Sequence, residues 1–411
     1  MVQGTAAPYT VVPDGSITTP QGFRAGGLHC GLKKTTRHDL GAIVCEVPAA
    51  AAAVYTTNLV QAAPLKVTRD SLGDGRLRAV LVNSGNANAC TGKRGEEDAF
   101  QMRASFAAAA GLAAGDIAVA STGVIGEPLR MDRVLDGIAK LPAALSADRA
   151  GADAFSQAIL TTDLVEKTGC VKLEIDGRTV HVAGAAKGSG MIHPNMATML
   201  GFVTTDAAIG SEALQRLLRT TTDRTFNMIT VDGDTSTNDM LVAMASGLAG
   251  NRELTEDHPQ WAQFAAAFRF ICETLAKAIA RDGEGATKLI EVRVSGAADE
   301  AAARAVAKTI VGSSLVKSAV FGADANWGRI IAAAGRAGVP IDPDAVDIRI
   351  GDIVTLERSR PIPFDEEAAL AYLKGDTIVI AVNLNMGAGE AIAWGCDLTY
   401  DYVRINAAYR T

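Results

Sequence analysis

Apolar residues recur at steps of three and four between Trp261 and Ile279, and this is the strongest helical pattern in the chain. Gly283 follows and ends the pattern. Weaker patterns predict further helices at 97–110, 131–141, 150–160, 211–219 and 301–310. Runs rich in Val, Ile and Thr predict strands at 41–47, 53–58, 77–82, 117–120, 170–175, 179–183, 199–203, 288–294, 348–356 and 377–384. We therefore expect an α/β fold, a mixed-sheet layered sandwich flanked by helices.

Three local features refine this prediction. Asp176 and Gly177 stand between two predicted strands and form a strong signal for a two-residue hairpin. An alanine run separates the strands at 41–47 and 53–58, so we expect a break there. The segment NSGNANACTG, which follows the strand at 77–82, is predicted to be a tight loop because of its Gly and Asn residues.

Composition and charge narrow the function classes. The chain has 411 residues, of which 48% are hydrophobic and 21% are charged, so it can bury a large core. Its net charge of -7 argues against nucleic acid or an anionic membrane as a partner, because both require a basic surface. There is no apolar run of membrane-spanning length and no signal-like N-terminus, so we expect a cytoplasmic protein. Because the chain as a whole is negatively charged, an anionic substrate must bind next to a local cation.

Cysteines and histidines do not indicate a metal site. The six cysteines form no CxxC pair and are predicted to be buried free thiols, and the five histidines show no zinc-ligand spacing. The polar cluster DGDTSTND at 232–239 lacks the glycine and glutamate that an EF-hand requires, and we interpret it as a loop near the functional site.

The most informative stretch is 187–200, KGSGMIHPNMATML. Its glycines, Pro194 and Asn195 predict a shaped turn, and the apolar run after it predicts a buried strand. Thr198 would then lie where that buried strand begins. If the chain were cut before Thr198, this threonine could act as a nucleophile with its own α-amine as the base.

This stretch resembles the cleavage segment of the glutamate N-acetyltransferase (ornithine acetyltransferase) family of arginine biosynthesis. The resemblance extends from the TTN segment at 56–58 to the C-terminal stretch WGCDLTYDYVRINAAYRT. It implies self-cleavage between Ala197 and Thr198 into an alpha chain, 1–197, and a beta chain, 198–411, which fold together. It also implies that acetyl is transferred from N-acetylornithine to glutamate through an acetyl-threonine.

The resemblance also suggests roles for individual residues. Thr198 would be the nucleophile, and the STG segment would supply Thr122 and Gly123 as the oxyanion hole. The TTD segment would supply a substrate-contacting threonine, Thr161 or Thr162, with Thr161 preferred. The remaining substrate-binding residues would be Lys187 for a carboxylate, Glu284 for the amine end, Asn406 and Thr411. Glu284 also follows the long helix, where a carboxylate is poorly placed for the helix dipole, and this too suggests function.

Several alternatives stay open at this level. A related self-cleaving amidase or aminopeptidase would use the same nucleophile but pass the acyl group to water. A non-catalytic amino-acid-binding protein would keep Thr198 as a turn residue in an intact chain. The general base could be the Thr198 amine or a water. No cofactor or metal is expected, acetyl-CoA is an open second acetyl donor, and the family suggests a heterotetramer of two alpha and two beta chains.

Overall fold

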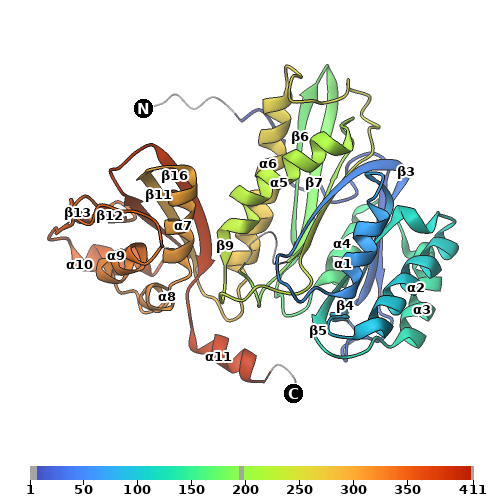
Figure 1. Ribbon diagram of the computed structural model, residues 1–411, viewed down its shortest axis with the longest axis horizontal. Coiled ribbons are helices and arrows are strands. Elements are labelled where there is room, and N and C mark those ends of the chain that lie inside the picture. Colours follow the sequence, from blue (N-terminus) through green and yellow to red (C-terminus); the bar gives the residue numbers. More distant parts are fainter. Residues whose placement is uncertain (1–6, 194–198, 409–411) are drawn as a thin grey trace. The chain divides into compact units, whose positions relative to one another are not determined.

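The computed structural model describes residues 7–193 and 199–408 and confirms a mixed α/β protein (Figure 1). The chain forms two compact units. The first consists of Met1–Gly188, Asn195–Asp223 and Thr235–Leu275, and the second of Ser189–Pro194, Arg224–Asp234 and Ala276–Thr411. Residues from both sides of 197/198 belong to each unit. The proposed chain break at that point remains a prediction, because an intact fold does not test it.

The first unit contains a mixed sheet of nine strands within the described residues. Its order is β1, β6, β7, β8, β10, β3, β4, β5, with β2 paired to β3. The strands are β1 (Thr10–Val11), β2 (Phe23–Leu28), β3 (Leu40–Tyr55), β4 (Arg76–Asn86), β5 (Ile117–Val124), β6 (Lys167–Ile175), β7 (Arg178–Lys187), β8 (Leu200–Thr205) and β10 (Met240–Ala245). The predicted hairpin is confirmed, since Ile175 pairs with Arg178 and both Asp176 and Gly177 have positive φ.

The predicted break in the alanine run is wrong, because β3 is one continuous strand of 16 residues. Alanine is small enough to fit an extended strand buried on both faces, and Ala51–Val54 are all buried. The strand instead has a register shift against β4 between Val44 and Ala49, next to Pro48, which has no N–H to donate. Its first part pairs with β2 and its last part with β10.

Helices cover the first sheet. They are α1 (Ala63–Ser71), α2 (Gly92–Ala110), α3 (Met131–Lys140), α4 (Arg149–Ile159), α5 (Ser211–Arg224) and the N-terminal part of α6 (Trp261–Arg281). The helices α2 and α3 contribute Phe106 and Ile138 to one core with Leu81 of β4. On the other side, α4 packs on β2, and its Phe155 ring meets Phe202 of β8 edge to face, with ring centroids 5.3 Å apart.

The second unit has its own mixed sheet, in the order β14, β13, β12, β15, β11, β16, β9. The strands are β9 (Ile229–Thr230), β11 (Leu289–Ala297), β12 (Asp347–Ile350), β13 (Ile353–Glu357), β14 (Arg360–Pro361), β15 (Thr377–Asn383) and β16 (Gly389–Cys396). Its helices include α7 (Glu300–Val311), which packs on β11 and β16, followed by α8 (Ser314–Phe321), α9 (Trp327–Gly335), α10 (Glu366–Leu373) and α11 (Tyr400–Ala407) (Figure 1). The single strand predicted at 348–356 is a hairpin, because Gly351 turns the chain with φ of +59°.

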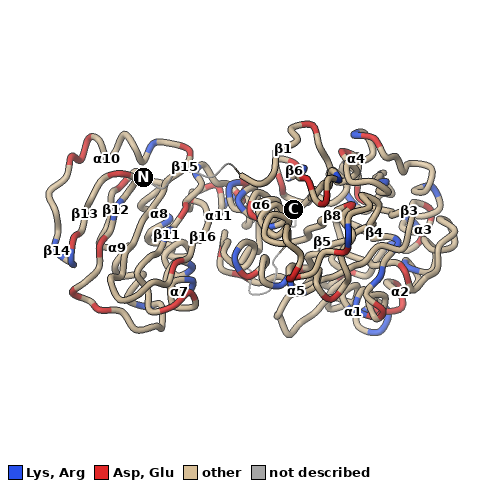
Figure 2. Tube along the Cα trace, turned by 90° about the horizontal axis from the view of Figure 1, so that it is seen from above, with Lys and Arg blue, Asp and Glu red and all other residues tan. Residues whose placement is uncertain are grey.

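The surface carries charges of both signs, and the thiols are unpaired. Lys and Arg are interspersed with Asp and Glu in both units (Figure 2). No helix in the described residues is long and apolar enough to cross a membrane. All six cysteines are free, and four of them are buried as predicted, but Cys90 is exposed and Cys30 is only partly buried.

Candidate functional site

The predicted oxyanion residues lie near the end of β5. The strand does not stop at Ala120 as expected but continues to Val124, with Thr122 opposite Ser84 and Gly123 opposite Gly85. Gly123 has φ of +135°, and a Cβ there would lie 2.4 Å from the carbonyl carbon of Gly85. Only glycine therefore fits this position without moving the neighbouring strand. The backbone of the predicted oxyanion hole is held by this close approach.

Lys187, the last residue of β7, contacts one of the predicted oxyanion residues. Its side chain is 7% exposed, and Nζ donates a hydrogen bond to Oγ1 of Thr122 at 3.3 Å. In the sheet, Lys187 pairs with Leu200, the first residue of β8. The predicted substrate cation thus lies beside a predicted oxyanion residue and opposite the start of the strand that follows Thr198. A buried ammonium group here can bind a substrate carboxylate.

The structure places Thr161 and Thr162 in the bend between α4 and β6. The Thr161 amide donates to Oδ2 of Asp163 at 2.9 Å. Asp163 also bonds the amide of Gly188, the residue after Lys187, at 2.7 Å. The predicted threonine segment and the predicted lysine are therefore linked through one buried carboxylate. Which of the two threonines contacts substrate remains a prediction.

Two polar residues beside Thr122 and Lys187, Asn238 and Asp239, end the polar loop 232–239, but the sequence assigned neither of them a role of its own. The Asn238 amide donates to the carbonyls of Ser121, at 2.8 Å, and Ala87. Burial raises the pKa of the Asp239 carboxyl well above its ordinary value, although Ser236 and the nearby Lys187 act to lower it. Burial therefore favours the protonated form of Asp239, while the charge of Lys187 favours its ionised form. The loop 232–239 was predicted to lie near the site, and its last two residues lie beside the predicted site residues. That these residues form the functional site remains a prediction.

A second group forms inside the second unit around Glu284. This residue is 7% exposed, and its amide donates to the Ser189 carbonyl at 3.1 Å. Asn406 of α11 donates from Nδ2 to Oε2 of Glu284 at 2.8 Å. Gly190 allows the close approach, because a Cβ there would lie 2.4 Å from the Glu284 carboxyl carbon. Two predicted substrate-binding residues, 122 positions apart in sequence, are thus in direct contact.

Asp232 holds the start of the predicted cleavage segment within the second unit. Its two carboxylate oxygens accept the amides of Met191 at 2.6 Å and Ile192 at 2.8 Å. Ser189 adds a hydrogen bond from Oγ to the Asp282 carbonyl at 2.7 Å. The segment is therefore held by side chains up to His193. The predicted nucleophile and cleavage residues Thr198 and Ala197, and the predicted substrate residue Thr411, lie outside the described residues.

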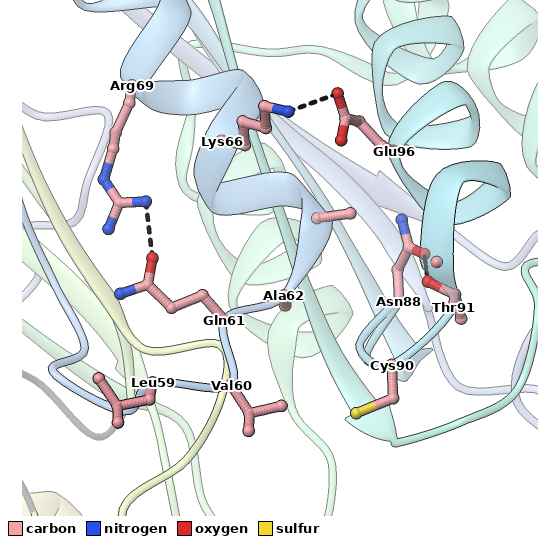
Figure 3. Close-up of a pocket in the computed structure, with 12 residues that line it drawn as sticks. Leu59, Val60, Gln61, Ala62, Lys66, Arg69, Asn88, Cys90, Thr91 and Glu96 are labelled. Carbon is pink, nitrogen blue, oxygen red and sulfur yellow. Dashed lines mark hydrogen bonds and ion pairs between the residues drawn. The ribbon is translucent and has the colours of Figure 1, made fainter.

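A pocket of about 440 Å³ opens in the first unit between α1, α2 and the loops before them (Figure 3). Its two cations have partners: Lys66 binds Glu96 at 2.7 Å, and Arg69 binds Gln61 at 2.8 Å. Of the predicted site residues that the structure describes, none lines it. Among the described residues, no group of His, Cys, Asp and Glu could hold a metal ion.

Comparison with known proteins identifies the family. The ArgJ family model matches residues 24–411. The arginine biosynthesis bifunctional protein ArgJ of Geobacillus kaustophilus is 60% identical over 407 residues, which cover 98% of each chain. The ArgJ protein of Halalkalibacterium halodurans is 61% identical over 399 residues, covering 97% of this chain and 96% of that protein. A crystal structure of ArgJ from Bacillus halodurans is 62% identical with a TM-score of 0.50, and the match covers 51% of this chain and 98% of that chain. The chain therefore belongs to the ArgJ family.

Proposed function

We propose that this protein is an N-acetyltransferase of arginine biosynthesis that moves acetyl from N-acetylornithine to glutamate. The observation that carries the proposal is the buried Lys187 ammonium beside Thr122, within an ArgJ family chain that contains the sequence KGSGMIHPNMATML. Donor and acceptor both have an amino-acid carboxylate, so one cation can bind each of them in turn. We place the enzyme in the cytoplasm.

The first step in the proposal is self-cleavage. Oγ of Thr198 attacks the carbonyl carbon of Ala197, the peptide C–N bond breaks, and the amine proton comes from the attacking hydroxyl. Water then hydrolyses the resulting ester, which leaves an Ala197 carboxylate and a free Thr198 hydroxyl and amine. The products are chains 1–197 and 198–411. The relative from Bacillus halodurans supports this proposal, because nearly all of its solved chain corresponds to about half of this one.

In the transfer reaction, the free Thr198 hydroxyl attacks the acetyl carbonyl of N-acetylornithine. Its proton passes to the base, either the Thr198 amine or a water, and then to the departing ornithine amine. Thr122 and Gly123 donate hydrogen bonds to the developing oxyanion. Glutamate then attacks the acetyl-threonine with its amine, and N-acetylglutamate leaves. One nucleophile therefore serves two amines in sequence.

The other predicted residues bind substrate. Lys187 pairs with the carboxylate, Glu284 with the amine end, and Asn406 orients the Glu284 carboxylate to which it is bonded. Thr161 or Thr162, together with Thr411, completes the contacts. No cofactor takes part, and acetyl-CoA is a candidate second donor that would load the same threonine. We further propose that two alpha and two beta chains form a heterotetramer, which native mass spectrometry would test.

The alternatives differ in what they do with the acetyl group. An amidase or aminopeptidase would release it to water, and a binding protein would have an intact chain and no acetyl intermediate. We expect N-acetylornithine alone to release about one equivalent of ornithine and to add an acetyl mass to the fragment that begins at Thr198. Glutamate should then discharge that fragment. Rapid loss of acetyl without glutamate would identify a hydrolase.

Self-cleavage has a separate test. Thr198→Ala should remain one full-length chain on a denaturing gel and have no transfer activity, whereas Thr198→Ser retains a hydroxyl and should cut slowly. An alanine variant that is cut normally would eliminate Thr198 as the attacking group.

A further inference from the structure

Asp163 is a buried carboxylate that accepts hydrogen bonds from three separate parts of the first unit. Its side chain is fully buried, as is that of Lys167, whose Nζ lies 2.7 Å from Oδ1 of Asp163. The same Oδ1 accepts the Gly188 amide at 2.7 Å, and Oδ2 accepts the Thr161 amide at 2.9 Å. One side chain thus binds the bend before β6, the start of β6 and the residue after β7.

Of these three donors, one is itself predicted to contact substrate and a second directly follows a predicted substrate-binding residue. Thr161 belongs to the predicted substrate-contacting pair, and Gly188 directly follows Lys187. The third donor, Lys167, lies opposite Ala186 in the pairing of β6 with β7. Because the carboxylate is small and rigid, the Thr161 and Gly188 amides cannot move apart while both remain bonded to it.

The surrounding charges keep this carboxylate ionised. Burial acts to raise the pKa of Asp163, but Lys187 and Lys167 and the bound amide of Thr161 lower it to about 2. Lys167 supplies the direct counter-charge for Asp163 through their ion pair. Lys187 is a second buried cation whose charge also acts on the Asp163 carboxylate.

We infer that Asp163 is a positioning residue, which sets the distance between Thr161 and Lys187 and so shapes the part of the site that recognises an amino-acid carboxylate. Lys167 is its counter-ion and does not touch the ligand. This inference rests on the proposed function for the identity of the ligand. It differs from a purely structural role, in which the buried pair would only stabilise the fold.

The test starts from Asp163→Asn, in which the carboxylate charge is lost and Lys167 is left as a buried cation without its ion pair. We expect kcat/KM for N-acetylornithine to fall about tenfold or more, mainly through KM, because hydrogen bonds to a charged group are lost. The double variant Asp163→Asn, Lys167→Met removes the stranded cation, so its Tm should recover while kcat/KM should not. Recovery of kcat/KM together with Tm would show a merely structural role and overturn the inference.

A matched control is available in the same unit. Asp206 is also buried and accepts two backbone amides, from His181 at 2.7 Å and Gln21 at 3.1 Å, neither of which is a predicted site residue. Asp206→Asn should lower Tm without a selective change in KM. An equal rise of KM in both variants would contradict a specific role for Asp163.

Two further measurements make the outcome decisive. If Asp163 acts through Lys187, the Asp163→Asn substitution should lower kcat/KM less in the Lys187→Met variant than in the wild-type protein. If the two residues act independently, the fold-losses of the single variants should multiply in the double variant. Because asparagine keeps only one acceptor oxygen, hydrogen exchange in Asp163→Asn should be faster at the Thr161 amide, the Gly188 amide or both. This readout does not depend on activity, so unchanged exchange overturns the inference even if the proposed transfer reaction itself is not found.

Discussion

Nζ of Lys187 lies 3.3 Å from Oγ1 of Thr122, although four strands stand between β7 and β5 in the order of the sheet. Neighbouring strands are about 4.8 Å apart, so a flat sheet would separate these two strands by about 24 Å. The contact therefore requires the sheet to curl. The register shift in β3, whose two parts pair with different strands, provides a place for that curvature.

Lys187→Met should weaken substrate recognition. Methionine keeps the length of the side chain but removes the charge, and loss of a charge-assisted hydrogen bond costs about 1.5–3 kcal/mol. We expect a corresponding fall in kcat/KM for N-acetylornithine, measured after cleavage has been verified by mass spectrometry. Lys172→Met, at an exposed position of the adjacent strand β6, is the control and should match wild type. Wild-type kinetics in Lys187→Met would rule out this lysine as the carboxylate-binding group.

Gly123→Ala should damage the end of β5. The new Cβ would meet the Gly85 backbone at 2.4 Å, and φ of +135° is unfavourable for alanine. We expect a loss of about 1–3 kcal/mol in unfolding free energy and a large loss of kcat. Gly126→Ala is a matched control, because Gly126 also has positive φ but has no atom within 4 Å of the added Cβ. Similar unfolding free energies for the two variants would mean that β4 and β5 can move apart to accept the added Cβ without a loss of stability.

Glu284→Gln should raise KM for the donor more than it lowers kcat. The neutral amide no longer attracts the ligand's amine, while it can still bond Asn406. We expect a KM change equivalent to about 1.5–3 kcal/mol. Glu390→Gln, at an exposed position of β16, should have no effect. If Glu284→Gln binds ornithine as wild type does in calorimetry, the carboxylate does not recognise the amine end.

His193 should make stability depend on pH. Burial, followed by the charge of Lys308, lowers its pKa from 6.5 to about 4 in the folded protein. The unfolded chain therefore binds more protons between these values, so this group makes the unfolding free energy rise as pH increases from about 4 to 6.5. His193→Gln should reduce that slope in urea titrations at several pH values. An unchanged slope would show that His193 titrates similarly in the folded and unfolded chains.

Some elements could be predicted because their signals are local. The spacing of Trp261, Phe264 and Phe268 indicates one face of a helix by itself, and α6 runs from Trp261 to Arg281. The Asp176–Gly177 turn is determined by backbone preferences of those two residues, and the hairpin forms as expected. Boundaries were less predictable: β5 continues past Ala120 because its residues pair with β4, a partner that local sequence does not reveal.

The sequence by itself determined the family resemblance, the helix of residues 261–281 and the residue types that acyl transfer needs, because each depends on neighbours along the chain. Only the tertiary structure decided that Lys187 meets Thr122 across 65 positions, that Asn406 binds Glu284 across 122, and that Asp163 joins Thr161 to Gly188. These contacts arise from strand pairing, sheet curvature and the burial of charges that must find partners. Such long-range interactions leave no periodic pattern in the sequence, so the grouping of the site residues becomes visible only in the folded chain.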